Sequence, residues 1–459
     1  MSLKRLERRR RSFRDQTIYR PLSQSSPQKG EFLSVKSNWK GDAAQASALP
    51  LVLAALIGML ASGVALSAEY QMESANLPVR QRQHPEADPT GFAYEGIMFY
   101  PSVLAGMEFD SNIYASSQNA SEDMALILAP ELRISSDSEA VKHTFDLGAS
   151  HRQYKSFDSE NRTEAHARLT SARQFTTDVR LDTLFEAARK FEARGSSITV
   201  PDAAKPIAYR DLRAETTVTK TFNRLGVAVG GGIRSLAFED GETFSGAPLE
   251  QGFRDGTIIT ASVKPFYEIS PGYRAYSLLK VNRRDYEGTG SLDRDSEGYD
   301  ARAGLEFLLT SMLFGSVDLG YLKQNYSNPL IPNADGLSTK ANLNWLMTPL
   351  MTVSLFGSRQ VAELAAQDQE ARIDLTVGAR VDYELRRNLI ATVEGSYTNE
   401  DFTGNNREDD VFNIGTQIDY MMNAYCSFGL KYSYFERNSN NADFSFDRHL
   451  VMLNVTAQY

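Results

Sequence analysis

The sequence predicts an all-β protein, a single transmembrane antiparallel β-barrel of about 18 strands, preceded by a signal peptide and a short periplasmic tail. Three observations lead to this prediction. Long segments alternate apolar and polar residues, short turns alternate with long polar loops, and the final alternating segment ends on Tyr459. The composition agrees, because 42% hydrophobic residues and a mean hydropathy of -0.37 are low for a helical membrane protein and suit strands with one apolar face.

The N-terminal region divides by composition. Residues 1–47 are polar and basic, and we expect a disordered leader. Residues 48–68 place an apolar stretch before small residues, which predicts a signal peptide, with a short membrane anchor as the alternative. Residues 69–95 show no periodic apolar pattern and are expected to form a periplasmic tail. The outer-membrane barrel should therefore occupy residues 96–459.

The clearest strand pair lies within residues 370–398. From Ala371 to Tyr383, apolar residues hold the odd positions and mostly polar residues the even ones, and a period of two is typical of a strand. A short turn follows, and the alternation resumes from Leu389, which predicts a β-hairpin. A strand of about 13 residues is long for a soluble sheet but suits a tilted strand that crosses a bilayer.

The same alternation predicts every strand of the barrel. In chain order the expected strands are 97–109, 123–134, 141–154, 163–175, 178–191, 209–222, 224–238, 256–268, 273–286, 297–309, 312–325, 337–347, 350–362, 370–384, 388–399, 410–421, 424–436 and 445–459. About eight of the connections are tight and nine are longer and polar. Short turns face the periplasm and long loops the exterior in such barrels, so both chain ends should be periplasmic.

Composition and spacing exclude several functions. A net charge of -9 without a basic cluster after the leader argues against a nucleic-acid partner. The single cysteine, Cys426, excludes an intrachain disulfide, and the five histidines show no ligand spacing, so no metal or cofactor is expected. The Gly226 to Gly232 run lies inside a strand and is no phosphate cradle. Bare glycine there should instead let a neighbouring side chain approach closely, and we expect no enzyme.

Charged residues on the polar face should point into the lumen. The candidates are Arg168, Arg180, Asp182, Glu186, Arg213, Glu215, Arg302, Glu306, Asp318, Arg372, Asp374, Arg380, Asp382, Glu394 and Asp419. Both signs of charge occur together, so two interpretations remain open. The residues form a ladder of cross-strand ion pairs that braces a wide barrel, or they form a polar lining that screens a passing solute.

The apolar face carries two further signals. Tyrosines near strand ends, such as Tyr321, Tyr383 and Tyr420, are expected to anchor the barrel at the membrane interfaces. In the last strand, Val455, Ala457 and the terminal Tyr459 share one face. This resembles the C-terminal signal by which the outer-membrane assembly machinery recognises its substrates.

The first expected loop carries a family resemblance. The segment Gly106 to Tyr114 reads GMEFDSNIY, and it resembles the start of members of the β-barrel porin 2 family. Asp110 and Asn112 would form a turn that caps the first strand. The resemblance covers about residues 90–459 and implies no catalytic residues. Because members often accompany exopolysaccharide or capsule loci, it implies a role in moving or handling a secreted polysaccharide.

Together these observations predict a porin-like channel in the cell outer membrane, exported through the signal peptide. We expect it to conduct a hydrophilic solute, with exopolysaccharide favoured by the resemblance. The alternative is a non-conducting structural or binding component of a polysaccharide export assembly. The expected partners are outer-membrane lipid and lipopolysaccharide, the assembly machinery and polysaccharide export proteins.

Overall fold

A computed structural model describes residues 77–138, 140–197, 200, 202–362, 371–403 and 406–459. The expected leader (1–47) and signal peptide (48–68) lie outside the described residues.

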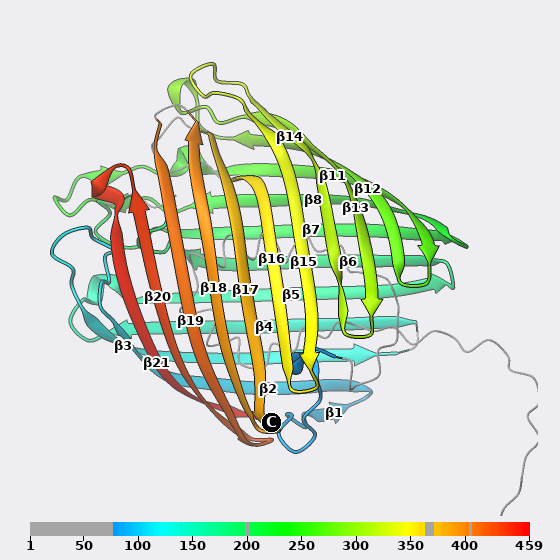
Figure 1. The fold of residues 1–459 in the computed structure, drawn as a ribbon. Coiled ribbons are helices and arrows are strands. Elements are labelled where there is room, and N and C mark those ends of the chain that lie inside the picture. Colours follow the sequence, from blue (N-terminus) through cyan, green and yellow to red (C-terminus); the bar gives the residue numbers. More distant parts are fainter. Residues whose placement is uncertain (1–76, 139, 198–199, 201, 363–370, 404–405) are drawn as a thin grey trace, which may run out of the picture.

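Eighteen long antiparallel strands form one closed sheet, as the sequence predicts (Figure 1). They are β2 (Ile97–Asp110), β3 (Asp123–Asp137), β4 (Val141–Tyr154), β5 (Arg162–Thr176), β6 (Val179–Phe191), β7 (Ala208–Phe222), β8 (Leu225–Phe238), β11 (Gly256–Ser270), β12 (Tyr273–Tyr286), β13 (Ser296–Thr310), β14 (Leu313–Tyr326), β15 (Ala334–Thr348), β16 (Met351–Ala362), β17 (Ala371–Arg386), β18 (Leu389–Thr403), β19 (Glu408–Asn423), β20 (Cys426–Ser439) and β21 (Phe446–Gln458). Each strand pairs with its neighbours in sequence, and β2 pairs with β21 to close the ring.

In the part of the chain that the structure describes, three short strands lie outside this ring. The strand β1 (Phe92–Tyr94) pairs with the first residues of β2, where the Phe92 ring stacks on Phe99 at 5.1 Å between centroids. The strands β9 (Gly241–Glu242) and β10 (Pro248–Leu249) form a small hairpin inside the connection between β8 and β11.

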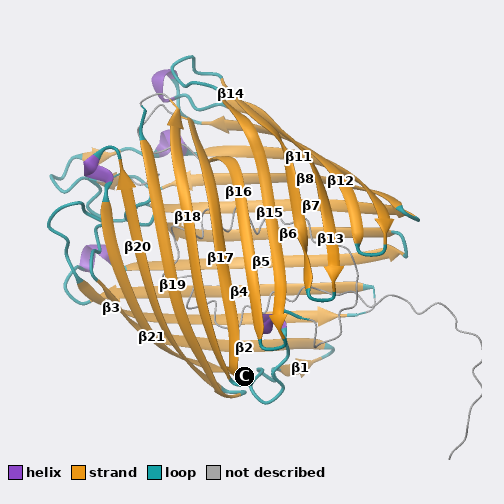
Figure 2. Ribbon diagram, in the orientation of Figure 1, coloured by secondary structure: helices purple, strands orange, loops and turns teal. Residues whose placement is uncertain are grey.

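The connections fall into the two expected classes at opposite ends of the barrel (Figure 2). Most short connections are turns of two residues, such as 223–224 and 271–272. Gly272 has a φ of 86° and Asn223 a φ of 57°, a region that glycine and asparagine tolerate better than other residues. The long connections carry short 3-10 helices, η3 (Asp158–Glu160), η4 (Gly252–Arg254), η5 (Gly290–Leu292) and η6 (Ala442–Phe444).

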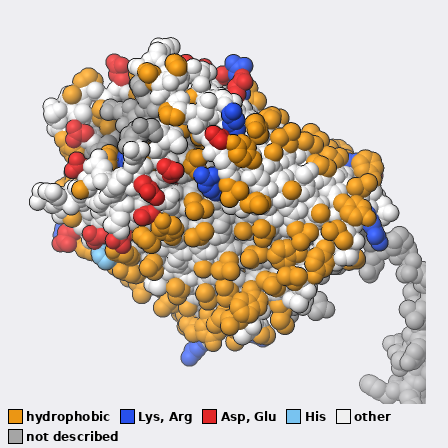
Figure 3. Space-filling model, turned by 45° about the horizontal axis from the view of Figure 1, so that its top comes forward, with side chains coloured by type: hydrophobic (Ala, Val, Ile, Leu, Met, Phe, Trp, Pro, Cys, Tyr) orange, Lys and Arg blue, Asp and Glu red, His pale blue; other side chains and the backbone are white. Residues whose placement is uncertain are grey.

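The alternation places polar residues inside and apolar residues outside. On β17, Val377 is 48% exposed, whereas its neighbour Thr376 is 2% exposed and hydrogen-bonds Thr398 on β18 across 2.9 Å between hydroxyl oxygens. Apolar side chains cover much of the outer face, and charged side chains gather at the long-loop end (Figure 3). The residues that a soluble protein would bury in a core therefore face outward here.

Ile373 does not follow this rule. Its position on β17 predicts an outward side chain like Val377, yet Ile373 is only 5% exposed and packs with Ile331, Ala334 and Ala371. The cluster forms where β17 begins, at the long-loop end, and Ile331 belongs to the loop between β14 and β15. Loop residues, which the strand pattern does not describe, cover this position.

No helix among the described residues has both the length and the apolar character needed to span a membrane. The described chain crosses from one end of the barrel to the other in strands alone.

Candidate solute pathway

Every charged residue that the sequence assigns to the lumen forms at least one ion pair. Several pairs join positions i and i+2 of one strand, because these side chains lie on the same face. Such pairs are Arg180–Asp182 at 2.8 Å, Arg213–Glu215 at 2.5 Å, Arg372–Asp374 at 2.7 Å and Arg380–Asp382 at 3.1 Å, each measured from nitrogen to oxygen. Weaker cross-strand contacts of 4.0 Å join Arg168 to Glu186 and Arg380 to Glu394. The lining is thus braced by same-strand pairs as well as by the expected cross-strand ones.

A second group of ion pairs and hydrogen bonds links residues of four neighbouring strands, β11, β12, β13 and β14. The carboxylate of Glu306 accepts from Lys264 Nζ at 2.5 Å and from Arg274 Nη1 at 3.4 Å. The carboxylate of Asp318 accepts from the Tyr276 hydroxyl at 2.7 Å and from Arg302 Nη1 at 3.0 Å. These residues come from neighbouring strands and lie on one wall of the lumen.

At the long-loop end, the loop between β6 and β7 reaches the opposite wall. The Ser197 hydroxyl donates to Glu400 on β18. Around the ring, β18 is eight strands from β6 in one direction and ten in the other. A Cβ added at Gly195 would lie 2.3 Å from the Phe446 ring of β21, so glycine allows the loop to pack there. This loop therefore narrows the outer mouth of the lumen.

Glu400 also belongs to a charged network on the wall that the loop reaches. It lies 3.9 Å from Arg372 Nη1 and 3.5 Å from Arg437 Nη2. Arg437 in turn lies 3.6 Å from Asp409, which accepts from Arg407 at 2.6 Å. Burial of this many charges is tolerable only because each has an opposite partner.

The loops that form the outer mouth are held by further buried pairs. Arg194 donates two hydrogen bonds to Glu160, at 3.2 and 2.6 Å, and the two side chains are 5% and 1% exposed. Arg254 donates to Glu192, and burial raises the pKa of the Glu192 carboxyl although Arg254 acts in the opposite direction. Loops that are pinned by buried charges are expected to keep one conformation.

The first loop forms the turn that its sequence suggests. The Asn112 backbone N–H donates to the Asp110 carboxylate at 3.0 Å. The Asn112 side chain donates to the Ser116 carbonyl and accepts from the Ser116 backbone N–H. Asp110 also accepts from Arg448 Nε of β21 at 2.9 Å. The motif thus caps β2 and ties the first strand to the last.

At the short-turn end, part of the expected tail binds to the lumen face of the barrel. We call residues 77–88 the inner segment; it contains the 3-10 helix η2 (Val79–Gln81), near the short turns in Figure 1. Arg80 donates to Asp382 on β17 at 2.9 Å, to Thr392 on β18 at 2.6 Å and to Asp419 on β19 at 2.7 Å. All three acceptors are on the lumen face.

Three further contacts hold the inner segment. The Val79 amide N–H donates to the Thr352 hydroxyl at 3.0 Å, and Arg82 lies 3.4 Å from Glu384. The Ala87 carbonyl accepts from Gln458 of β21 at 3.3 Å. Burial lowers the pKa of Arg80, but Asp419 and Asp382 outweigh it and leave the pKa raised, so this guanidinium stays charged.

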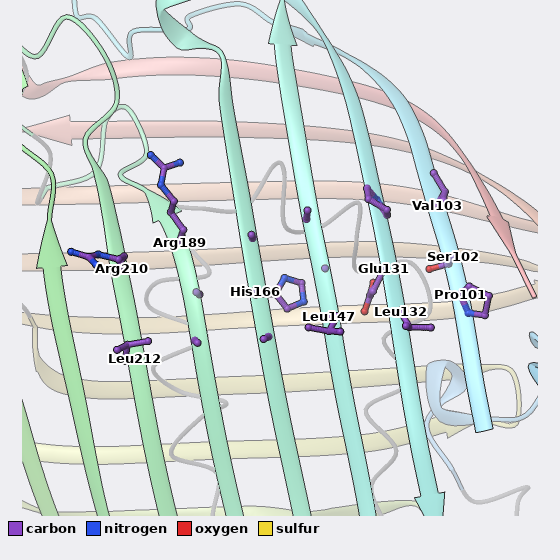
Figure 4. A pocket seen from close by; sticks show the side chains of 17 residues that line it. Pro101, Ser102, Val103, Glu131, Leu132, Leu147, His166, Arg189, Arg210 and Leu212 are labelled. Carbon is purple, nitrogen blue, oxygen red and sulfur yellow. The ribbon is translucent and has the colours of Figure 1, made fainter. Parts of the chain in front are cut away.

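A shallow hollow of about 750 Å³ lies across β2 to β7 (Figure 4). Its lining is mostly small and apolar, including Ala149, Ala165 and Ala167. Val103 and Leu212 also line it. They are 42% and 53% exposed and occupy positions of their strands whose side chains point outward. The hollow therefore opens on the lipid-facing surface and does not belong to the lumen.

Sequence reasoning missed two sets of residues. Lys264, Lys280 and Lys340 occupy positions of their strands whose side chains face the lumen. The alternation of polar and apolar residues that predicted the lumen-facing arginines could therefore have predicted these lysines as well. Arg80 and Arg82 carry no such signal, because the tail has no periodic pattern. Val455, Ala457 and Tyr459, for which the sequence predicts an assembly signal, are exposed at the end of the chain, the first two on the outer face of β21.

Among the described residues, no three histidine, cysteine or acidic side chains are placed to hold a metal ion.

Solved structures align with most of this chain at low identity and with TM-scores below 0.5. The crystal structure of Pseudomonas aeruginosa OpdK with vanillate aligns with a TM-score of 0.42 and 9% identity, covering 79% of this chain and 99% of that one. Acinetobacter baumannii OccAB4 aligns with a TM-score of 0.44 and 11% identity, covering 82% and 100%. A search of curated proteins found no match.

A family model gives the assignment. The model described as Putative beta-barrel porin 2 matches residues 84–459, which is the barrel together with the end of the inner segment. The family is one of porins and not of enzymes. The chain therefore belongs to the Putative beta-barrel porin 2 family, and it is an outer-membrane β-barrel with a porin-like fold.

Proposed function

We propose that this protein is a gated conduit for a hydrophilic solute across the outer membrane. The observation that carries the proposal is the lumen lining, in which charged and hydroxyl side chains follow the inner face of the strands. A barrel of about 18 strands is wide enough for an aqueous channel unless chain segments fill it. Membership of a porin family supports the same conclusion.

The inner segment is the proposed gate. It lies at the short-turn mouth and is held mainly by Arg80, which bridges three neighbouring strands. Charge-assisted hydrogen bonds are strong enough to hold the segment, yet each of them can exchange with water. The segment would keep the inner mouth narrow until it is released.

The identity of the solute and the export route belong to the same proposal. We favour exopolysaccharide because of the family resemblance in the Gly106–Tyr114 motif. Export through a signal peptide at residues 48–68 and recognition of Val455, Ala457 and Tyr459 by the assembly machinery would bring the chain to the outer membrane. Lipopolysaccharide and polysaccharide export proteins are the proposed partners there.

A second candidate is a non-conducting component of a polysaccharide export assembly. It is favoured by the chain segments at both mouths, the loop that reaches Glu400 and the inner segment bound to Asp382. If these segments are permanent, the barrel would serve as a scaffold.

Solute flux distinguishes the two candidates. Purified protein in liposomes should admit a small neutral sugar such as arabinose, measured by liposome swelling, and a larger sugar should enter more slowly. Folding is checked first by the change in gel mobility on heating. A folded barrel that admits no sugar, both intact and without residues 69–91, would overturn the conduit and favour the scaffold.

A further inference from the structure

The lumen wall formed by β11 to β15 carries a group of cations that we call the lysine cluster. It consists of Lys264, Lys280, Arg302 and Lys340. Lys340 lies within electrostatic range of the other three and of Asp318. None of the four residues is fully buried, and the side chains of Lys264 and Arg302 are 12% and 11% exposed.

The carboxylates in this region are largely engaged by other groups. Glu306 is shared by Lys264 and Arg274, and Asp318 accepts from both Arg302 and the Tyr276 hydroxyl. Asp300 lies 3.2 Å from Arg302 Nε. Three carboxylates therefore face five cations, which are the four of the cluster and Arg274.

Lys280 is the cation without a close partner. It forms no ion pair or hydrogen bond within the described part of the chain, although Asp300 is its cross-strand neighbour. The acid that acts on it at longer range, Glu215, is bound by Arg213 at 2.5 Å. The remaining charges that act on it, Arg213, Arg284 and Arg302, are cationic.

An ammonium group held beside other cations costs free energy unless an anion compensates it. The opposite situation occurs at the short-turn mouth, where Arg80 of the inner segment compensates Asp382 and Asp419. No described segment supplies an anion to Lys280 in the same way. The compensating group would therefore come from outside the chain.

We propose that the lysine cluster is a binding site in the lumen for an oxyanion group of the solute, with Lys280 as its central contact. Two lysines at the sides of one oxyanion supply donors without fixed geometry, which suits a carboxylate, phosphate or sulfate that moves past. The proposal deepens the conduit and rests on it, because it assigns an anionic solute, such as an acidic sugar, to the same pathway.

The test compares flux and binding of three probes of similar size, galactose, galacturonate and galactose 6-phosphate. The variants are Lys280→Gln and the double variant Lys280→Gln/Lys340→Gln. The matched control is Lys190→Gln, which removes one lumen charge from a lysine already paired with Asp211 at 3.0 Å and Glu186 at 3.3 Å. Heat-modifiable gel mobility verifies that each variant folds.

In the natural sequence both anionic probes should enter liposomes faster than galactose. The Lys280 variants should lose about two- to fivefold of this preference, the ratio expected from removal of a partly screened charge, while Lys190→Gln keeps it. Preference for one anionic probe over the other identifies a carboxylate or a phosphate solute. If all three probes enter measurably and at equal rates, or if an anion preference survives in the double variant, the site is overturned.

Titration calorimetry of trigalacturonate with the protein in detergent separates this proposal from the conduit. Binding that disappears in the double variant supports the site even if no probe crosses the liposome membrane, in which case only the conduit fails. If sugars cross but trigalacturonate does not bind, the conduit stands and the anion site is wrong.

Discussion

The face on which a residue lies determines what a charged substitution costs. Val377→Arg would place a guanidinium on the outer face near the middle of β17, where the side chain is now 48% exposed to the surroundings of the barrel. We expect a loss of about 2–4 kcal/mol in the free energy of unfolding, as for arginine at a bilayer midplane. Denaturant titration in lipid vesicles measures it.

Ser396→Arg is the matched control. Ser396 on β18 pairs with Gly378, the residue that follows Val377, so it lies at a similar depth in the barrel. Its side chain, however, faces the lumen. An equal loss from both substitutions would mean that the two faces of the sheet have similar surroundings and would contradict the assignment of lipid outside and water inside.

Substitution of a buried charged residue in a loop has a different effect. It destabilises the loop because the partner of opposite charge remains buried and uncompensated. Glu160→Gln would leave the guanidinium of Arg194 buried without its carboxylate. Loss of one member of such a pair costs about 3–5 kcal/mol locally. The loop between β6 and β7 should then become sensitive to added protease, whereas Asp158→Asn, at an exposed position of the same turn, should leave it resistant.

At the scale of single residues, the sequence predicted which side chains share a face but not which partners they meet. The period of two assigns Arg302 and Asp318 to the lumen, and they form a pair there. The same rule fails at Ile373, since a loop covers it. Arg80 was not predicted, because its partners lie about 300 residues away and no local pattern connects them.

At the scale of strands, close contact between neighbouring backbones limits the size of residues on the wall. A Cβ added at Gly320 would lie 1.9 Å from the Ala301 carbonyl oxygen, and backbone cannot move aside as a flexible side chain can. We expect Gly320→Ala to destabilise the barrel by about 1–3 kcal/mol, as overpacking does. Gly231→Ala is the control, since the nearest atom there is 3.8 Å away.

Thermal unfolding of both glycine variants, followed by gel mobility, tests this prediction. Equal midpoints for Gly320→Ala and Gly231→Ala would show that β13 and β14 separate more easily than their contact suggests. The close contact expected for the Gly226 to Gly232 run is also present, because a Cβ at Gly226 would lie 2.1 Å from the Phe266 ring.

Strands and turns were predictable because local rules determine them. All 18 ring strands and their alternation of short and long connections agree with the sequence prediction, since side-chain alternation and turn residues act over a few positions. The long loops were predicted only as polar connections. Their contacts across the lumen, such as Ser197 to Glu400, depend on the closed ring and have no local pattern.

At the scale of the whole molecule, the barrel is a polar pathway with a chain segment at each mouth. The outer mouth is narrowed by a loop pinned through buried pairs, and the inner mouth by the inner segment, whose ion pairs are more exposed to solvent. The inner segment should therefore be the easier of the two to release. Substitution of Arg80 and Arg82 by glutamine removes its ion pairs while leaving every strand unchanged.

The central claim, that the lumen conducts and the inner segment gates it, is tested most directly by single-channel conductance in planar bilayers. The natural sequence should give small or intermittent channels, and Arg80→Gln/Arg82→Gln should give larger or more persistently open ones. The substitution Lys190→Gln, which removes a lumen pair with Asp211 at the opposite, long-loop end, should match the natural sequence. Absence of any resolvable channel in the folded double variant would contradict the account.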